Sequence, residues 1–248
     1  MQVLQQFISG PDTCHYLPDR DATQQYAEMA RLSPEEYEHL MNQGWRKFGA
    51  TLFRPVCAHC SECRPLRIPT AEFIPDRSQQ RAWRRNADLE VRCALPTVDA
   101  VRLDLYRRYQ AEQSATKGWP DAERTARSYA RQFVSNPVPS VEISVWEGET
   151  LRAIVITDIT PSCVSGVYHF HDPDCRARGL GTYALLQTIE LARRLEKPWV
   201  YFGYYVAGCA SMAYKTRFQP HEILQPNGVW EQMLGTDAGI IEAPHRNR

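Results

Sequence analysis

The sequence lacks a long apolar run and a net charge. Its longest uncharged apolar stretch, residues 198–206 (PWVYFGYYV), is less than half of the roughly 20 residues that a membrane-spanning helix needs. No basic start followed by an apolar segment opens the chain, so no secretory signal is recognised. These absences predict a cytoplasmic protein with no membrane partner. The 29 Lys and Arg balance 29 Asp and Glu, so a polyanionic partner must be bound by a local basic patch.

Internal repeats and low-complexity tracts are also absent, and 248 residues suffice for one large domain or two small ones. The sequence pattern changes near residues 95–100 (LPTVDA), from a loop-rich part to one with regular helix and strand patterns. We therefore predict a loop-rich, cysteine-containing N-terminal domain over residues 1–95 and a second domain over residues 96–248. In the first, Ser33, Pro34 and Glu36 have the pattern of a capping box that starts a helix.

The second part of the chain alternates helical and strand patterns. Periodicity predicts helices near residues 101–112, 123–134 and 181–195, and strands at residues 141–146, 152–159, 163–171 and 198–206. Antiparallel strands followed by a strand–helix–strand crossover indicate an α/β (α+β) fold with a mixed sheet and flanking helices.

The join between the third strand and the long helix, residues 171–187 (HDPDCRARGLGTYALLQ), carries the most information. Arg176, Gly179 and Gly181 form an R-x-x-G-x-G loop, whose backbone N–H groups and helix N-terminus suit an anion. Alone, this pattern is more often only the chemistry of a tight turn. In its place after antiparallel strands, it resembles the acyl-CoA-binding loop of the GCN5-related N-acyltransferases.

Four longer blocks carry a more specific resemblance. They are GWRKFGATLFRPVCAHCSECRPLRIP, FIPDRSQQRAWRRNADLEV, VYHFHDPDCRARGLGTYALLQTIELAR and YFGYYVAGCASMAYKTRFQPHEIL. Together they resemble the bacterial aminoacyl-tRNA–protein transferases, relatives of the arginyl-tRNA–protein transferases. The resemblance implies transfer of leucine from leucyl-tRNA to the N-terminal amine of proteins that begin with Asp or Glu, which marks them for degradation. It also implies an acyltransferase-like C-terminal fold that uses no CoA. Arginine as the donor amino acid stays open.

Such a reaction needs little from the protein beyond placement of the two substrates. An aminoacyl-tRNA is an activated ester, and an α-amine with a pKa of about 7.7–8.0 is partly neutral near pH 7. The enzyme must hold the amine against the ester carbonyl and supply donors to the developing oxyanion. No Ser-His-Asp or Cys-His arrangement is required.

Selection of an acidic acceptor requires a cation near the amine. Residues 213–220 (AYKTRFQP) offer Lys215 and Arg217, which we assign to the acceptor side chain or the aminoacyl end; a pair of solvated charges is the alternative. We predict that Lys215, Tyr204 and Tyr168 form the catalytic group, although buried tyrosines more often only pack.

Two histidines and several arginines extend this set. His169 and His171 share a strand face, but no third metal ligand is evident, so a structural role is favoured. For the tRNA phosphates, the candidates are Arg77, Arg81, Arg84 and Arg85 on one helix and Arg176, Arg178, Gly179 and Gly181 at the glycine loop. A solvated helix face paired with nearby carboxylates explains the first group equally well.

The cysteines at two-residue gaps are Cys57, Cys60 and Cys63. With Cys14 as a fourth ligand they suit a structural zinc or an iron–sulfur cluster. A cluster of structural thiols is the alternative, and a nucleophile is disfavoured because direct aminolysis needs none. We expect no cofactor to be required for catalysis.

Two other classes of protein compete with this interpretation. An acyl-CoA-dependent N-acetyltransferase would share the fold and the glycine loop. A non-catalytic, zinc-dependent nucleic-acid-binding module would explain the cysteines and arginines. We expect a monomer that binds aminoacyl-tRNA and acceptor proteins.

Overall fold

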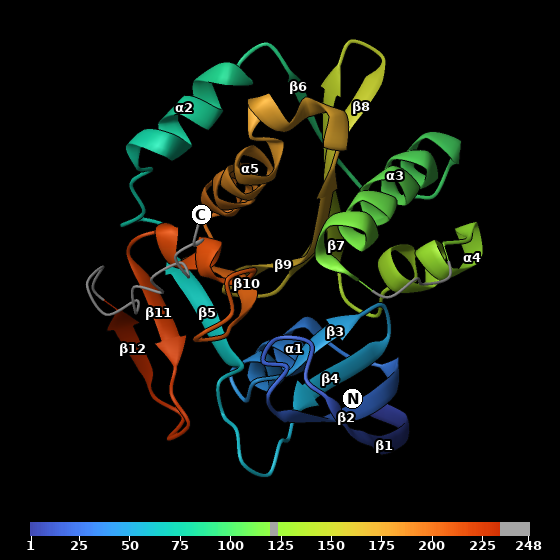
Figure 1. Ribbon diagram of the computed structural model, residues 1–248, viewed down its shortest axis with the longest axis vertical. Helices are drawn as coiled ribbons and strands as arrows, with labels where there is room; N and C mark the ends of the chain where they lie inside the picture. The colour runs from blue at the N-terminus through green and yellow to red at the C-terminus, as the bar shows by residue number, and fades with distance from the viewer. Residues whose placement is uncertain (120–123, 234–248) are drawn as a thin grey trace, which may run out of the picture.

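The structure is a computed structural model that describes residues 1–119 and 124–233. An antiparallel four-stranded sheet, in the order β1-β2-β4-β3, occupies one end of the molecule (Figure 1). Its elements are β1 (Gln2–Thr13), β2 (Asp21–Arg31), β3 (Arg46–Phe48) and β4 (Thr51–Pro55), with α1 (Pro34–Met41) packed beside them.

The larger sheet has eight strands in the order β12-β11-β5-β10-β9-β8-β7-β6. Their bounds are β5 (Arg64–Pro69), β6 (Glu90–Ala94), β7 (Ser140–Glu147), β8 (Thr150–Ile159), β9 (Cys163–His171), β10 (Trp199–Tyr205), β11 (His221–Leu224) and β12 (Trp230–Met233). Neighbours are antiparallel except β9 and β10, which run parallel and are joined by α5 (Leu180–Arg194). The predicted mixed sheet with flanking helices is therefore confirmed.

Helices cover both faces of this sheet (Figure 1). On one side lies α5, with α2 (Arg77–Arg85) packed on it; on the other lie α3 (Ala100–Lys117) and α4 (Ala126–Tyr129), which continues into a π-helical turn (Ala130–Val134). Alternate residues of β8 enter the two cores: Ala153 and Val155 pack with α5, whereas Ile154 and Ile156 pack with α3. Burial on both faces explains the unbroken apolar run in β8.

The capping signals are confirmed. Ser33 Oγ accepts a hydrogen bond from the Glu36 N–H at 3.2 Å, and the Glu36 carboxylate accepts one from the Ser33 N–H at 2.8 Å, which together form the predicted capping box of α1. The helix predicted over residues 123–134 is found from Ala126, and residue 123 lies outside the described residues.

The N-terminal part has more regular structure than the expected loop-rich domain, because β1 and β2 form a long hairpin. Nearly all of β1 is exposed, so its sequence carries no apolar alternation to reveal the strand. Both β5 and β6 precede residue 95 yet lie in the large sheet, so the two sheets do not divide the chain there. None of the described helices has the length and apolar character to cross a membrane.

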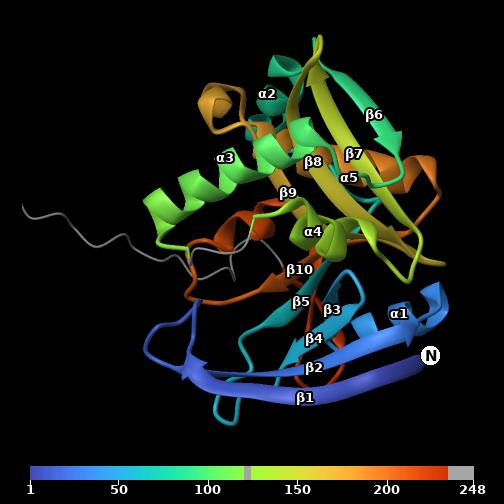
Figure 2. The same cartoon turned by 90° about the vertical axis from the view of Figure 1, so that its right-hand side faces the viewer.

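The four-stranded sheet lies directly against the lower end of the larger sheet (Figure 2). A buried ion pair joins the two sheets. Lys47 Nζ on β3 lies 2.8 Å from Asp158 Oδ2 on β8, and both side chains are 0% exposed. Asp158 Oδ1 also accepts hydrogen bonds from Ser140 Oγ at 2.8 Å and from Asn136 Nδ2 at 2.9 Å. Burial lowers the pKa of Lys47, and the Asp158 charge acts in the opposite direction. This network fixes β3, and with it one wall of the site described next.

Candidate active site

The parallel strands β9 and β10 separate and open a cavity. They pair only where Trp199–Tyr201 lies beside Cys163–Ser165 in the described part of the chain. The pairing of β10 with β5 is irregular between Tyr201 and Tyr204, and Gly203 there has φ +74°, a conformation that favours glycine. A cavity of about 1560 Å³ lies between the diverging strands and is lined on the other side by residues of the N-terminal sheet and of the loop that carries Cys57, Cys60 and Cys63.

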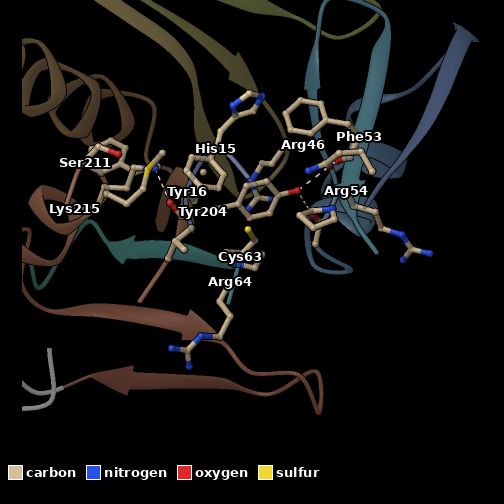
Figure 3. A pocket seen from close by; sticks show the side chains of 18 of the residues that line it. His15, Tyr16, Arg46, Phe53, Arg54, Cys63, Arg64, Tyr204, Ser211 and Lys215 are labelled. Carbon is tan, nitrogen blue, oxygen red and sulfur yellow. Dashed lines mark hydrogen bonds between the residues drawn. The ribbon is translucent and has the colours of Figure 1, made fainter. Parts of the chain in front are cut away.

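Lys215 is buried in the wall of this cavity (Figure 3). It lies on a short 3-10 helix, η3 (Ala213–Arg217), and is 6% exposed. Its Nζ donates to the Tyr204 carbonyl oxygen at 2.6 Å. Burial, followed by the charge of Arg46, lowers the pKa of Lys215 to about 8. The ammonium is therefore mainly charged at neutral pH, and no carboxylate among the described residues forms a salt bridge with it.

The two candidate tyrosines line the same cavity but use their hydroxyl groups differently. Tyr204 donates to the Gly44 carbonyl oxygen at 2.6 Å, so its proton is already engaged. Tyr168 accepts from Gln110 Nε2 at 2.7 Å, which leaves its proton available to a ligand. Burial raises the pKa of both groups, so both stay protonated at neutral pH.

The first turn of α5 also faces the cavity, through Gly181 and Thr182. Gly179 precedes this turn at φ +68° and has no side chain that could cap the helix. The first N–H groups of α5 therefore have no capping side chain as a hydrogen-bond acceptor. A Cβ added at Gly181 would lie 3.1 Å from His171 Cε1, so this glycine lets the imidazole pack against the start of the helix. Part of the glycine pattern is therefore explained by packing.

His169 and His171 both line the cavity. Burial lowers their pKa values to about 3 and about 4, so both imidazoles are neutral. Within the described residues, no third side chain joins them in an arrangement that could hold a metal ion.

Most of the predicted arginines lie outside the cavity. Arg217 is 53% exposed, and its Nη2 lies 3.9 Å from Asp76 Oδ2. Arg176 is exposed and pairs with Glu112, and Arg178 forms ion pairs with Asp88 at 2.9 Å and Glu147 at 2.7 Å. The four arginines of α2 are all exposed; they are Arg77, Arg81, Arg84 and Arg85. The structure thus brings Lys215, Tyr204, Tyr168 and Gly181 together and leaves these cations apart.

Comparison with known proteins matches almost the whole described chain. Residues 12–81 match the model "Arginine-tRNA-protein transferase, N terminus", and residues 101–225 match "Arginine-tRNA-protein transferase, C terminus". The chain belongs to the arginine-tRNA-protein transferase family. The resemblance found in the four sequence blocks is therefore confirmed. The protein is an enzyme of the aminoacyltransferase class.

Members of this family resemble the chain over nearly their full length. A protein of Nitrosococcus oceani named aspartate/glutamate leucyltransferase is 38% identical over 222 residues, which cover 88% of this chain and 92% of the relative. A protein of Pseudomonas savastanoi pv. phaseolicola with the same name is 37% identical over 220 residues, with the same coverage. Among solved structures, one described as the crystal structure of FemX has a TM-score of 0.49 at 8% identity and covers 80% of each chain.

The four cysteines proposed for this transferase as metal ligands share one wall of the cavity: they are Cys14, Cys57, Cys60 and Cys63. Cys57 Sγ accepts from the Thr23 N–H at 3.4 Å, and Cys60 Sγ accepts from Arg20 Nη1 at 3.4 Å. Burial, followed by the neighbouring thiols, raises the pKa of Cys63 to about 12. As these thiols are placed, no group of three His, Cys, Asp or Glu side chains among the described residues is arranged to hold a metal ion. A structural zinc ion or an iron–sulfur cluster at these cysteines stays a prediction.

Arg46 lines the cavity of this transferase and was missed by sequence reasoning. It is 5% exposed and begins β3, directly after the turn that follows α1. The available signal was the adjacent Arg46-Lys47 pair at the start of a segment whose neighbours are apolar and aromatic (GWRKFG). Two buried cations in such a segment are unusual unless each has a partner or a ligand.

Proposed function

We propose that this protein transfers the leucyl group of leucyl-tRNA to the N-terminal α-amine of proteins that begin with Asp or Glu. Relatives named aspartate/glutamate leucyltransferase that match it over 88% of its length support this proposal. The observation that carries it is the cavity, which is lined by the buried Lys215, by Tyr168 and by the first turn of α5. Its products would carry a destabilising N-terminal residue, and the reaction would occur in the cytoplasm on a monomeric enzyme.

The size of the cavity fits two substrates. Sites for one small molecule usually measure about 300–1,000 Å³, whereas this cavity measures about 1560 Å³. The aminoacylated end of a tRNA and the first residue of an acceptor can therefore occupy it together. Residues with apolar side chains in its lining, including Leu17, Phe53, Leu185 and Val206, suit the leucyl side chain.

The reaction is a direct aminolysis. The neutral amine attacks the ester carbonyl, a peptide bond forms, and the ester C–O bond breaks as the 3′ oxygen of the tRNA leaves and takes a proton. Lys215 is charged near neutral pH and can stabilise the tetrahedral oxyanion or donate the proton to the leaving oxygen. Tyr168 can donate its free hydroxyl proton to the same centre. Tyr204 acts as a positioning residue, because its carbonyl holds Lys215.

The tRNA is bound by backbone groups and by surface arginines in this proposal. The uncapped first turn of α5, which follows Gly179 and contains Gly181, offers N–H groups and partial positive charge to the terminal phosphates. Arg77 and Arg81 on α2, both exposed, have no carboxylate partner in the described chain and can meet phosphates outside the cavity. Arg178 already has two carboxylate partners, so it is expected to contribute less.

One assay tests donor and acceptor together. The purified protein is mixed with a pool of charged tRNAs and with peptides that begin with Asp, Glu or Ala, and the products are identified by mass spectrometry. Leucine added to the Asp and Glu peptides supports the proposal. Arginine added instead would favour the second candidate, an arginyltransferase, which the family description supports. Absence of transfer together with thermal stabilisation by acetyl-CoA would favour an N-acetyltransferase.

Lys215 provides a sharper test of the mechanism. Loss of one oxyanion donor typically lowers kcat by about 10²–10³-fold, so Lys215→Met is expected to lower kcat by that order with a much smaller change in KM for leucyl-tRNA. Lys197→Met is the matched control, because Lys197 is a half-buried lysine outside the cavity whose Nζ also donates to a backbone carbonyl, that of Pro161, at 2.8 Å. Equal kinetics for the two variants would contradict the assigned role.

A further inference from the structure

We infer that Arg46, together with Lys215, is the residue that selects an acidic N-terminal side chain on the acceptor. This inference rests on the proposed function and assigns a specificity-determining role to a residue for which the sequence blocks and the glycine loop gave no role. It also replaces the exposed Arg217, which lies outside the cavity, as the partner of Lys215 in this role.

The bonding of Arg46 is incomplete in the described chain. Its Nη1 donates to the carbonyl oxygens of Met41, at 3.2 Å, and of Trp45, at 2.5 Å. Its Nε and Nη2 are buried and have no hydrogen-bond partner among the described residues. A buried guanidinium with unsatisfied donors is costly unless the protein uses its charge.

Two aromatic rings hold the guanidinium in place. Arg46 Cζ lies 5.4 Å from the ring centroid of Tyr201 and 5.4 Å from that of Tyr204. Arg46 and Tyr204 are both labelled in Figure 3. The guanidinium therefore lies against both rings, and the Tyr204 side of it faces the cavity, which Arg46 and Tyr204 both line. In a wall of low dielectric constant such a charge acts over a longer distance than it would in water.

Arg46 and Lys215 share this part of the cavity wall. The charge of Arg46 contributes to the lowered pKa of Lys215, so the two cations repel each other. No described carboxylate forms a salt bridge with either of them. A carboxylate that enters the cavity relieves the repulsion and gains attraction to both groups, which an amide of the same shape cannot do.

The other cavity arginines are already engaged. Arg54 donates to Gln25 Oε1 at 2.9 Å and lies 4.8 Å from the Trp45 ring centroid. Arg64 donates to Gln225 Oε1 at 3.1 Å. Both have a polar side-chain partner, unlike Arg46.

A purely structural role for Arg46 is the competing explanation. In that case, the two bonds to carbonyl oxygens at the end of α1 would fix β3, and the charge would be incidental. This explanation accounts for Nη1 and leaves Nε and Nη2 without a function. A structural role predicts lower stability and lower activity on every acceptor, whereas the inference predicts a change of preference between acceptors.

The test compares kcat/KM for two pairs of peptides that differ only in charge at the first residue: Asp against Asn, and Glu against Gln. Arg46→Gln is expected to lower the preference for the acidic peptide by about 100-fold, and Arg46→Lys, which keeps the charge without the planar fork, by about 10-fold. Arg67→Gln is the matched control: Arg67 Cζ also lies over two rings, those of Trp199 and Trp230, but the residue is outside the cavity. Its preference is expected to stay unchanged.

A second measurement uses the wild-type protein, in case Arg46→Gln does not fold. The rate at which an amine-reactive reagent labels Lys215, followed against pH by mass spectrometry, gives the pKa of Lys215 with and without peptide. A bound Asp peptide is expected to raise this pKa, and a bound Asn peptide is not. Equal effects of the two peptides would overturn the inference.

The two proposals fail in different ways. A wild-type protein that transfers nothing to any of the four peptides refutes the proposed function and the inference with it. Selective transfer by the wild type that is fully retained in Arg46→Gln refutes only the inference. A uniform loss on acidic and amide peptides alike assigns Arg46 to structure and also refutes it.

Discussion

The buried ion pair between Lys47 and Asp158 should dominate the stability of the contact between the two sheets. Both side chains are 0% exposed, and their charged atoms are 2.8 Å apart. Lys47→Met leaves the Asp158 carboxylate buried with only Ser140 and Asn136 as donors. Removing one partner of a buried pair typically costs about 3–5 kcal/mol. For a chain of this size, 1 kcal/mol corresponds to about 2–4 °C, so Tm should fall by roughly 10 °C.

The double variant Lys47→Met with Asp158→Asn separates the cost of the unpaired charge from the loss of packing. The new amide keeps an oxygen for Ser140 and Asn136 and carries no charge, so most of the lost stability should return. Thermal unfolding followed by circular dichroism and by calorimetry measures both steps. Arg194→Met is the control, because Arg194 forms an exposed pair with Glu190 at 3.7 Å and should change Tm little. A double variant no more stable than Lys47→Met would refute the reasoning.

Three further predictions concern the site and its supports. Tyr168→Phe should lower kcat by about 10-fold or more with little effect on KM, since the hydroxyl proton left free by Gln110 is lost; steady-state kinetics decide, and an unchanged kcat would exclude a donor role. Gly203→Ala should cost about 1–2 kcal/mol of stability, because φ there is +74°. Its new Cβ would lie 3.7 Å from Lys215 Nζ, an ordinary contact distance, so kcat should fall far less than in Lys215→Met; unfolding and kinetic measurements on one preparation test both. Burial raises the pKa of Glu38, but hydrogen bonds from Ser162 and Thr160 outweigh this effect and leave the folded pKa below its ordinary value of 4.5. The stability that these bonds provide is therefore present above pH 4.5 and is lost as the pH falls through the folded pKa. Glu38→Gln should flatten this acid dependence of Tm in thermal melts, and identical pH profiles for the two proteins would refute the link.

The C-terminal elements were predictable because their patterns report burial. The strands from residue 141 to 171 and the helix that follows have apolar residues at the spacings that two packed cores impose. The hairpin of β1 and β2 was not predictable in this way, because its outer strand is held mainly by backbone hydrogen bonds and shows an exposed, unpatterned face. The alternation of apolar and polar residues therefore predicts a strand only where one face of that strand is buried.

The candidate site was predictable in part. Lys215, Tyr168 and Gly181 were identified in sequence blocks, and they line one cavity. Arg46 was not identified, because its role depends on an unpaired guanidinium and on a neighbour 169 positions later in the chain, neither of which a local pattern contains. The proximity of Arg217 to Lys215 in sequence was misleading as a guide to space, since residues of a 3-10 helix two positions apart point in different directions.

The position of β5 has a consequence for how this protein is made. This strand is synthesised long before its two neighbours in the sheet, β10 and β11; Pro69 pairs with Trp199, and Leu66 pairs with Ile223. Until β10 and β11 have been synthesised, both edges of β5 are unpaired, and the cavity that Lys215 lines is incomplete. Because β10 and the segment with Lys215 follow β5 by well over a hundred residues, the cavity can form only after these later segments have been synthesised and β10 has paired with β5.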